Sequence, residues 1–357
     1  MNNNYWLLPE YFSDALPNEA FKIEQIRRKL LDLYFENNFE LVIPPMLEYL
    51  ESLMTGSGKD LDLKTFKIID QFSGRLLGIR ADITPQIARI DAHLLLNRQQ
   101  QINKLCYCGN VLYTKPDNIT QGRERQQIGV EIFGDEQISA DFEIINLLKT
   151  SLNAIQVPLR RIDLNHVGIF SALVELFSQL VLSLNAQQIG KLSKFLQHKD
   201  IPALQEFFRK IYYNSQHRLN GIRQDALQII GEIFCELPNL YGDDANVVLQ
   251  NAENLFAKLH QIDIQKNLIQ LTKSMEDLRW LISQNAKFNN ALSLDLSDLR
   301  GYHYHTGIVF SAYGGTQDQP LELARGGRYD GVGKAFGRER AATGFSMDLR
   351  TLAKILI

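Results

Sequence analysis

Hydrophobic and polar positions follow two different periods along this chain, and the period changes twice. In the N-terminal part, short apolar runs separated by turn residues predict strands, and helical spacing appears over 18–37 and 139–155. From about residue 170 to 286 apolar residues recur almost throughout at helical spacing, so this stretch is predicted to be helical. The β-pattern returns at about residue 291 and gives way to a helix over about 347–357. Because helices come irregularly rather than as strand–helix–strand units, we predict an α+β fold with a largely antiparallel sheet.

The strands of the N-terminal part are expected to pair locally. Phe66–Asp70 and Arg75–Arg80 predict a hairpin across the Ser73–Gly74 turn. Lys104–Tyr113 and Ile128–Phe133 are two further strands, joined by a long polar loop. Long loops between strands often carry function.

Polar side chains stand at the ends of these strands. Asp82 and Thr84 lie at a strand-to-helix corner, where Thr84 is expected to cap a helix that begins at Pro85. Gln127 lies just before the apolar run IGVEIF, and Glu131 lies within it. A buried unpaired charge is too costly to keep, so Glu131 either faces solvent from an edge strand or is buried with a partner.

The segment Arg300–Phe310, RGYHYHTGIVF, places one arginine, two tyrosines and two histidines within six residues. The flanking runs Leu294–Leu299 and Ile308–Tyr313 predict strands, so the segment is expected at a strand junction. If it is extended, its tyrosines and Thr306 point to one side and its histidines to the other. We interpret it as a pocket wall; the alternative is a half-buried strand with satisfied polar groups.

Composition narrows the class of protein. The 357 residues carry 38 basic and 41 acidic side chains, a net charge of -3, with no basic cluster typical of nucleic-acid binding. Three cysteines do not form a disulfide framework and are typical of a reducing compartment. The N-terminus does not resemble a signal peptide and the apolar runs are too short to span a bilayer. We therefore expect a cytoplasmic protein with no nucleic-acid or membrane partner.

Metal and phosphate motifs are weak. His303-x-His305 and Cys106-x-Cys108 each lack a second ligand pair at zinc-like spacing, so neither a metal nor a cofactor is expected. Within the glycine-rich stretch Ala324–Gly333, the segment Arg325–Arg328 could cradle a phosphate, but without the Walker spacing it is interpreted as a turn. Acids, an amide and an aromatic wall instead suit a small polar ligand that bears an amino group.

The same polar stretches carry a resemblance to a known family. IRADITPQIAR at 79–89, GNVLYTKPDNITQGRERQQIGVEIFG at 109–134 and LRGYHYHTGIVF at 299–310, with RGGRYDG and TGFSMDLRTL nearer the end, resemble the class II histidyl-tRNA synthetase core. The resemblance implies a mainly antiparallel sheet flanked by helices, formed by 1–165 and 287–357, with a helical insertion over 166–286.

The resemblance also implies an amino-acid pocket, carried over position by position. Asp82 and Thr84 would hold the amino group of the ligand, and Gln127 and Glu131 would face the amino acid. The remaining wall would come from Arg300, Tyr304 and His305.

Departures from the synthetase pattern argue against catalysis. The Phe-Arg-x-Glu pattern that clamps the α-phosphate is replaced by Leu112–Lys115, and the glycine and arginine of the last motif fall at Asp348 and Thr351. Loss of both arginines should remove most adenylation activity, so no catalytic residue is assigned. Only Leu352–Ile357 follow the last motif, so we expect no anticodon-binding domain.

The motifs that depart from the synthetase pattern resemble those of a second group of proteins. RADITPQIARIDAH, LRGYHYHTG and GFSMDL are similar to the regulatory subunit of the short-form ATP phosphoribosyltransferase, a synthetase paralogue of histidine biosynthesis. This resemblance implies a non-catalytic protein that activates a short catalytic subunit within a hetero-oligomer, expected to be a hetero-octamer. It also implies self-association as a dimer and feedback inhibition by histidine, with no cofactor of its own.

Two other functions remain open from the residues alone. The chain could be a minimal synthetase-like ligase that activates histidine or a similar amino acid, if Arg123 or Arg125 supplied the phosphate clamp. It could also be an amino-acid-binding module for another partner.

Overall fold

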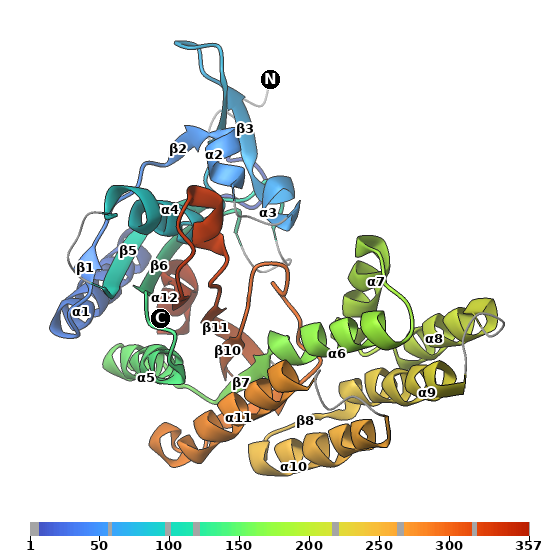
Figure 1. Ribbon diagram of the computed structural model, residues 1–357. Coiled ribbons are helices and arrows are strands. Elements are labelled where there is room, and N and C mark those ends of the chain that lie inside the picture. Colours follow the sequence, from blue (N-terminus) through green and yellow to red (C-terminus); the bar gives the residue numbers. More distant parts are fainter. Residues whose placement is uncertain are drawn as a thin grey trace. The chain divides into compact units, whose positions relative to one another are not determined.

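The computed structural model describes residues 7–55, 59–96, 101–116, 122–215, 221–262, 268–315 and 320–356. The chain forms two compact units (Figure 1). The first unit consists of Met1–Leu159 with Tyr313–Ile357, and the second is Arg160–Ala312. No helix in the described ranges is both long and apolar enough to cross a bilayer.

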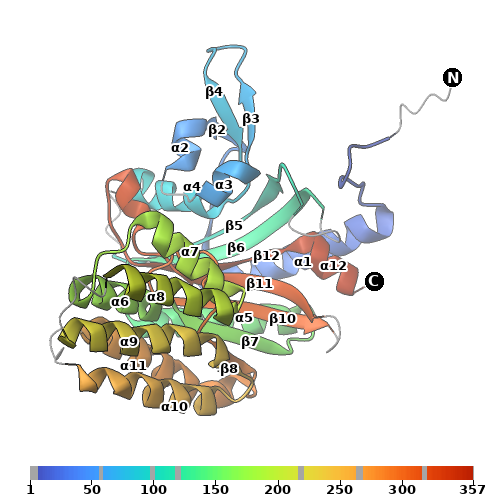
Figure 2. The ribbon, with the colours of Figure 1, turned by 90° about the vertical axis from the view of Figure 1, so that its right-hand side faces the viewer.

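The first unit is built on a sheet with the strand order β1-β5-β6-β12-β11. The strands are β1 (Glu40–Leu41), β5 (Asn103–Leu112), β6 (Glu124–Phe133), β12 (Ala342–Asp348) and β11 (Pro320–Arg328). Only β1 pairs in parallel, with β5, and the other three pairings are antiparallel, so the predicted antiparallel character is confirmed. Figure 2 shows β5, β6, β12 and β11 side by side.

Strand β6 is apolar on one face and polar on the other, and this alternation places the candidate site. Ile128, Val130 and Ile132 are buried, and Phe345 pairs with Val130 and packs edge-on against Tyr34. This face is covered by three helices: α1 (Pro17–Glu36), α5 (Ile138–Ala154) and α12 (Leu349–Ile355). Because side chains alternate along a strand, Gln127 and Glu131 project from the opposite face.

The opposite face of the sheet is covered by α4 (Thr84–Arg89), which continues into the π-turn η1 (Ile90–Leu94). Ile83 and Ile87 from this segment are fully buried in one cluster with Leu105 and Tyr107 of β5. The polar groups of β6 therefore lie under a helix that is anchored by apolar packing.

A smaller sheet of the first unit has the order β2-β4-β3. It consists of β2 (Leu47–Tyr49), β4 (Leu76–Ile79) and β3 (Phe66–Ile69), accompanied by α2 (Leu50–Met54) and α3 (Lys59–Lys64). The β3–β4 pairing with Gly74 at φ +71° confirms the hairpin predicted across Ser73–Gly74.

The second unit combines a small sheet with helices. Its strands are β7 (Arg161–His166), β9 (Leu292–Asp295), β8 (Tyr241–Gly242) and β10 (Ile308–Gly315), of which β10 runs across the boundary between the units. The helices are α6 (Val167–Leu180), α7 (Ala186–Gln197), α8 (Ile201–Ser215), α9 (Gly221–Glu236), α10 (Ala245–Phe256) and α11 (Ile269–Ser283). Short 3-10 turns are η2 (Leu237–Asn239), η3 (Ala257–Gln261), η4 (Asn285–Phe288) and, in the first unit, η5 (Val332–Phe336).

The helical character predicted from about residue 170 to 286 is confirmed by α6 to α11. The unit that holds these helices is larger than the predicted insertion 166–286, because β7 and β9 belong to it as well. The assignment of 1–165 and 287–357 to one core stays a prediction.

Candidate ligand-binding site

Strand register brings Glu131 and Tyr107 together on the α4 side of the sheet. Glu131 pairs with Gly344 of β12, and Tyr107 of β5 pairs with Gly129. A Cβ atom on Gly344 would lie 1.7 Å from Glu131 Oε2, and one on Gly129 would lie 2.5 Å from the Tyr107 hydroxyl. The two glycines therefore leave the space that the carboxyl and phenol groups occupy.

The Glu131 carboxyl is buried and surrounded by hydroxyl groups. Thr84 Oγ1 donates to Oε1 at 3.0 Å, the Tyr107 hydroxyl donates to Oε1 at 3.2 Å, and the Tyr329 hydroxyl donates to Oε2 at 2.7 Å. Glu131 is 1% exposed. Of the two readings that the sequence left open, the structure supports the buried carboxyl with partners.

Burial controls the protonation of this group. It raises the pKa of Glu131 to about 8, against the hydrogen bonds from Tyr329, Thr84 and Tyr107, which lower it. The nearby carboxylate of Asp82 raises this pKa as well. The neutral form of Glu131 is therefore favoured at neutral pH.

Asp82 and Gln127 form a second set of contacts beside Glu131. Gln127 Nε2 donates to Asp82 Oδ1 at 2.8 Å, and Gln127 Oε1 accepts the backbone N–H of Ile83 at 3.0 Å. Both side chains are half-buried. The carboxylate of Asp82 is therefore held in place by an amide while part of its residue stays accessible.

The capping role expected for Thr84 is wrong. Helix α4 begins at Thr84 itself, and the backbone N–H of Thr84 donates to Asp82 Oδ1 at 3.1 Å. The Thr84 hydroxyl instead contacts Glu131 and, at 3.1 Å, the Tyr107 hydroxyl. The Thr84 hydroxyl therefore serves the buried carboxyl group and not the N-terminus of α4.

Two tyrosines complete the network and were not predicted from the sequence. Tyr107 is 0% and Tyr329 3% exposed, and burial together with Glu131 raises the pKa of each phenol well above its ordinary value. Both remain neutral donors at physiological pH. Tyr107 could have been found from the pairing of β5 with β6, because it lies opposite Gly129 two residues from Glu131.

Arg325–Arg328 is not the predicted turn, because these residues form the end of strand β11 (Pro320–Arg328). Its Arg328 binds Asp141 of α5, with Nη2 at 2.7 Å and Nε at 3.0 Å from Oδ2. The Thr343 hydroxyl donates to Asp141 Oδ1 at 2.8 Å. Arg328 therefore ties a helix to the sheet rather than cradling a phosphate.

The aromatic-histidine segment of the second unit is a turn. Gly301 has φ +75°, and its carbonyl oxygen accepts the N–H groups of Tyr304 and His305 at 3.1 Å each. The alternation of side chains expected from an extended segment is therefore wrong, because glycine at positive φ reverses the chain. Strand β9 also ends at Asp295 rather than Leu299, whereas β10 begins at the predicted Ile308.

Within this turn, the Arg300 guanidinium donates through Nε to Asp298 Oδ1 at 2.7 Å. Tyr304 is 41% exposed, and its ring centroid lies 4.4 Å from that of His305. The structure thus brings Asp82, Thr84, Gln127 and Glu131 together in the first unit. Arg300, Tyr304 and His305 gather in the second unit, and the seven-residue pocket stays a prediction.

The two arginines considered as alternative phosphate clamps are engaged by aromatic rings and carbonyl groups. The Arg123 guanidinium lies 4.8 Å from the ring centroid of Phe12, and its Nε donates to Tyr113 O at 3.0 Å. The Arg125 guanidinium lies 4.3 Å from the Tyr113 ring centroid. Neither position supports a clamp poised for phosphate.

An acidic side chain occupies the place where the last motif of a synthetase has glycine. Asp348 pairs in register with Gln127 and caps α12 by accepting the N–H groups of Arg350 and Thr351. It also accepts the N–H of Gln126 at 3.2 Å. A carboxylate beside Gln127 would repel a phosphate group bound there.

The described residues contain no group of three or more His, Cys, Asp or Glu side chains arranged to hold a metal ion. Burial raises the pKa of Cys106 to about 12 and that of Cys108 to about 11. Both thiols are therefore protonated at neutral pH, the form that binds metals poorly.

Comparisons with known proteins agree with this architecture. The family model described as histidyl-tRNA synthetase matches residues 11–352. A relative from Azoarcus sp. (strain BH72), an "ATP phosphoribosyltransferase regulatory subunit", is 44% identical over 353 residues, 98% of this chain and 81% of its own length. A relative of the same name from Paraburkholderia phymatum is 46% identical over 351 residues, 98% of this chain and 82% of its own.

Solved structures confirm the predicted fold class. An ATP phosphoribosyltransferase regulatory subunit/histidyl-tRNA synthetase from Bacillus halodurans superposes with a TM-score of 0.78 at 26% identity, over 98% of this chain and 83% of that one. A histidine–tRNA ligase subunit from Alicyclobacillus acidocaldarius gives a TM-score of 0.75 at 20% identity, over 98% and 97%. The α+β fold with a class II synthetase-like core is therefore established.

Proposed function

This chain belongs to the histidyl-tRNA synthetase family and, within it, to the ATP phosphoribosyltransferase regulatory subunits, and from that membership we propose how its polar network serves regulation. The resemblance inferred from the motifs is confirmed. The chain is a non-catalytic regulatory subunit of histidine biosynthesis, which activates the catalytic subunit and mediates feedback inhibition by histidine.

We propose that the network around Asp82, Thr84, Gln127 and Glu131 binds the histidine that regulates the enzyme. Asp82 offers a half-buried carboxylate to the ammonium group of the ligand, and Gln127 holds this carboxylate through its amide at 2.8 Å. Glu131 lies deeper and keeps Thr84, Tyr107 and Tyr329 in position. Arg300, Tyr304 and His305 are proposed to supply the remaining wall.

One observation supports this proposal: the polar network that would contact the amino acid is fully hydrogen-bonded, whereas no arginine takes the expected place of a phosphate clamp in the described residues. The carboxyl-hydroxyl network is complete, whereas Asp348 stands where a synthetase has glycine and Arg123 and Arg125 are held elsewhere. A site of this kind can hold an amino acid without activating it. The alternative of a minimal ligase finds no support in this arrangement.

The partners are proposed at a finer level than the family name. We propose a complex with the short-form catalytic subunit, expected to be a hetero-octamer, in which this chain also associates with a second copy of itself. Coupling would follow from linkage, because histidine shifts the complex toward whichever state binds it more tightly. A cytoplasmic location fits this role.

The test is reconstitution with the catalytic subunit. The purified chain alone should show no phosphoribosyl transfer, and adding it to the catalytic subunit should raise the rate and confer inhibition by histidine. A catalytic rate and histidine sensitivity that are the same with and without this chain would refute the proposal.

A further inference from the structure

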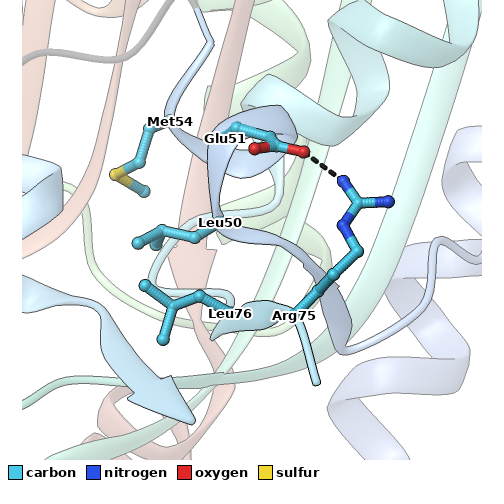
Figure 3. Close-up of a pocket in the computed structure, with 5 residues that line it drawn as sticks. All are labelled: Leu50, Glu51, Met54, Arg75 and Leu76. Carbon is cyan, nitrogen blue, oxygen red and sulfur yellow. Dashed lines mark hydrogen bonds and ion pairs between the residues drawn. The ribbon is translucent and has the colours of Figure 1, made fainter. Parts of the chain in front are cut away.

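The pocket of about 380 Å³ between α2 and β4 is separate from the residues of the proposed histidine site (Figure 3). None of the seven residues predicted to contact a ligand is among the five that line it: Leu50, Glu51, Met54, Arg75 and Leu76. The turn that carries three of those seven residues bears more directly on ligand binding, because other elements of the second unit hold it in place.

The connection between β9 and β10, residues 296–307, contains no regular helix or strand, so its shape depends on contacts with other elements. One junction, where β7 ends and α6 begins, binds it at two places. Asn165 Nδ2 donates to the carbonyl oxygen of Asp298 at 2.7 Å, and the backbone N–H of Val167 donates to the carbonyl oxygen of Gly307 at 3.0 Å. This junction therefore holds both ends of the segment that carries the predicted wall residues.

Asn165 is 1% exposed, and both polar atoms of its amide are used. Its Oδ1 accepts the backbone N–H of His166 at 2.7 Å, while its Nδ2 donates to Asp298. A backbone N–H can only donate and a carbonyl oxygen can only accept, so these two partners require an amide and fix its orientation. A carboxylate at this position would place one of its oxygens against the carbonyl oxygen of Asp298.

Asp298 passes this restraint on to Arg300. The guanidinium donates through Nε to Asp298 Oδ1 at 2.7 Å and binds Oδ2 through Nη2, and the backbone N–H of Arg300 donates to Oδ1 at 3.2 Å. Nη2 also donates to Ser311 Oγ of β10 at 3.4 Å. A two-point contact of this kind fixes the plane of the guanidinium. Because Asn165 holds the backbone of Asp298, the orientation of Arg300 depends on Asn165 as well.

The junction is itself fixed to its neighbours. His166 caps α6, with Nδ1 accepting the N–H of Gly168 at 3.1 Å, and its Nε2 lies 3.4 Å from Asp277 Oδ2 of α11. Strand β7 also pairs in parallel with β9. Asn165 is therefore a support that is held by a helix on each side and by the sheet.

We propose that Asn165 is a positioning residue for the recognition of histidine, which orients Arg300, through Asp298, toward the carboxylate of the ligand. The inference rests on the proposed function, in which Arg300 belongs to the wall of the histidine pocket. A guanidinium matches a carboxylate in charge and in geometry, so its contribution to affinity depends on its orientation. Asn165 is too deeply buried to contact the ligand, and its effect is confined to ligands that carry a carboxylate.

Titration calorimetry of the full chain with histidine and with histamine, which lacks the carboxylate, tests this role. Asn165→Asp keeps the size of the side chain and the acceptor for His166 but loses the donor to Asp298. It should weaken histidine binding about tenfold and leave histamine binding unchanged, so the preference of the wild type for histidine falls by the same factor. A merely structural defect would weaken the binding of both ligands alike.

Two further variants keep the test independent of the added charge. Asn165→Ser is uncharged and too short to reach Asp298, so it should also lose part of the preference for histidine, and circular dichroism checks that both variants fold. Arg300→Gln should lose the preference, and adding Asn165→Asp to it should cause no further loss, because both changes act on one contact.

Asn285→Asp is the matched control. Asn285 Oδ1 accepts the N–H of Leu292 at 3.1 Å, at the opposite end of β9, and an aspartate can accept the same N–H. This variant should bind histidine and histamine as the wild type does.

Three results would overturn the inference while the proposed function stands: Asn165→Asp binds histidine as tightly as the wild type, it weakens histidine and histamine equally, or the control loses the preference as well. A wild-type chain that binds no histidine would refute the proposed pocket and the inference together. In the enzyme reconstituted with the catalytic subunit, Asn165→Asp should retain activation and need about tenfold more histidine for half-inhibition.

Discussion

Among single residues, Glu131 decides the electrostatic behaviour of the proposed pocket. Its three hydrogen-bond partners, Thr84, Tyr107 and Tyr329, are neutral hydroxyl groups, and burial raises the pKa of its carboxyl to about 8. An approaching ammonium or imidazolium group would favour the ionised form of Glu131. Ligand charge and the protonation of this residue are therefore expected to be linked.

Replacing Glu131 by Gln should weaken histidine binding to the purified chain. Glutamine keeps the shape of the side chain but cannot ionise, and hydrogen bonds to charged groups contribute roughly 1.5 to 3 kcal/mol, or about 10-fold to 150-fold in affinity. Titration calorimetry measures the change. Glu136→Gln, at an exposed position after β6, is the control, and equal affinity of the wild type and Glu131→Gln would show that Glu131 is purely structural.

The raised pKa of Glu131 predicts that the stability of the chain depends on pH. Because its pKa is raised from 4.5 to about 8 on folding, the folded chain binds more protons than the unfolded chain between these values. The contribution of Glu131 to stability is therefore greatest at low pH and falls as pH rises from about 4.5 to about 8, by up to roughly 5 kcal/mol.

Urea unfolding at pH 5 and pH 8.5 checks this dependence. Glu131→Gln lacks the titrating proton, so its stability relative to the wild type should increase between the two pH values. A difference between the two proteins that does not change with pH would contradict the assigned protonation.

Among the elements, close pairing of strands β6 and β12 creates the space for the network. Gly344→Ala would place its Cβ 1.7 Å from Glu131 Oε2 and 2.3 Å from Val130 O, so the strands or the carboxyl must shift. We expect a loss of about 1 to 3 kcal/mol in the free energy of unfolding. Gly190→Ala in α7 meets nothing within 4 Å and should stabilise the chain by up to about 1 kcal/mol. Thermal unfolding that affected both variants alike would argue against this packing.

Helix α5 is tied to the sheet by a buried ion pair. Asp141 is 1% exposed and binds Arg328 at 2.7 Å. Asp141→Ala would remove the nearest carboxylate from a buried guanidinium that keeps Asp330 and two backbone carbonyl groups, at a cost of up to about 3 to 5 kcal/mol. The ion pair of Glu322 with Arg325 is more exposed than that of Asp141 with Arg328, so Glu322→Ala should cost about 1 kcal/mol or less. Chemical denaturation of both variants measures the contrast, and similar losses would mean that Asp141 contributes no more than a surface pair.

Local patterns predicted those elements whose residues interact with near neighbours. The β3–β4 hairpin and α5 followed from turn residues and helical spacing, and a glutamate within an apolar strand pointed to Glu131. Tyr329 was missed because it lies just after β11, 198 residues from Glu131 along the chain, and no local pattern reveals that contact.

The prediction of an extended conformation for Arg300–Phe310 was wrong for a different reason. Tyrosine favours strands, yet Gly301 adopts φ +75° and closes a turn there. Local preference did not predict this reversal. The role of its side chains was inferred from the resemblance, so it depends on a ligand-bound measurement.

For the whole molecule, the central claim is that a synthetase pocket has become a sensor. The first unit holds a complete carboxyl-hydroxyl network, which we propose binds histidine, while Asp348 caps α12 and Arg125 lies against the Tyr113 ring. For histidine to inhibit through this site, it must bind the inhibited state of the complex more tightly than the active state.

Histidine inhibition of the reconstituted enzyme with Asp82→Asn tests this claim most directly. Asparagine preserves the oxygen that accepts from Gln127 but removes the charge offered to the ligand, so activation should persist while the histidine concentration for half-inhibition rises about tenfold or more. Glu136→Gln should behave as the wild type. Unchanged inhibition by histidine with Asp82→Asn would contradict the account, because the sensor would then lie elsewhere.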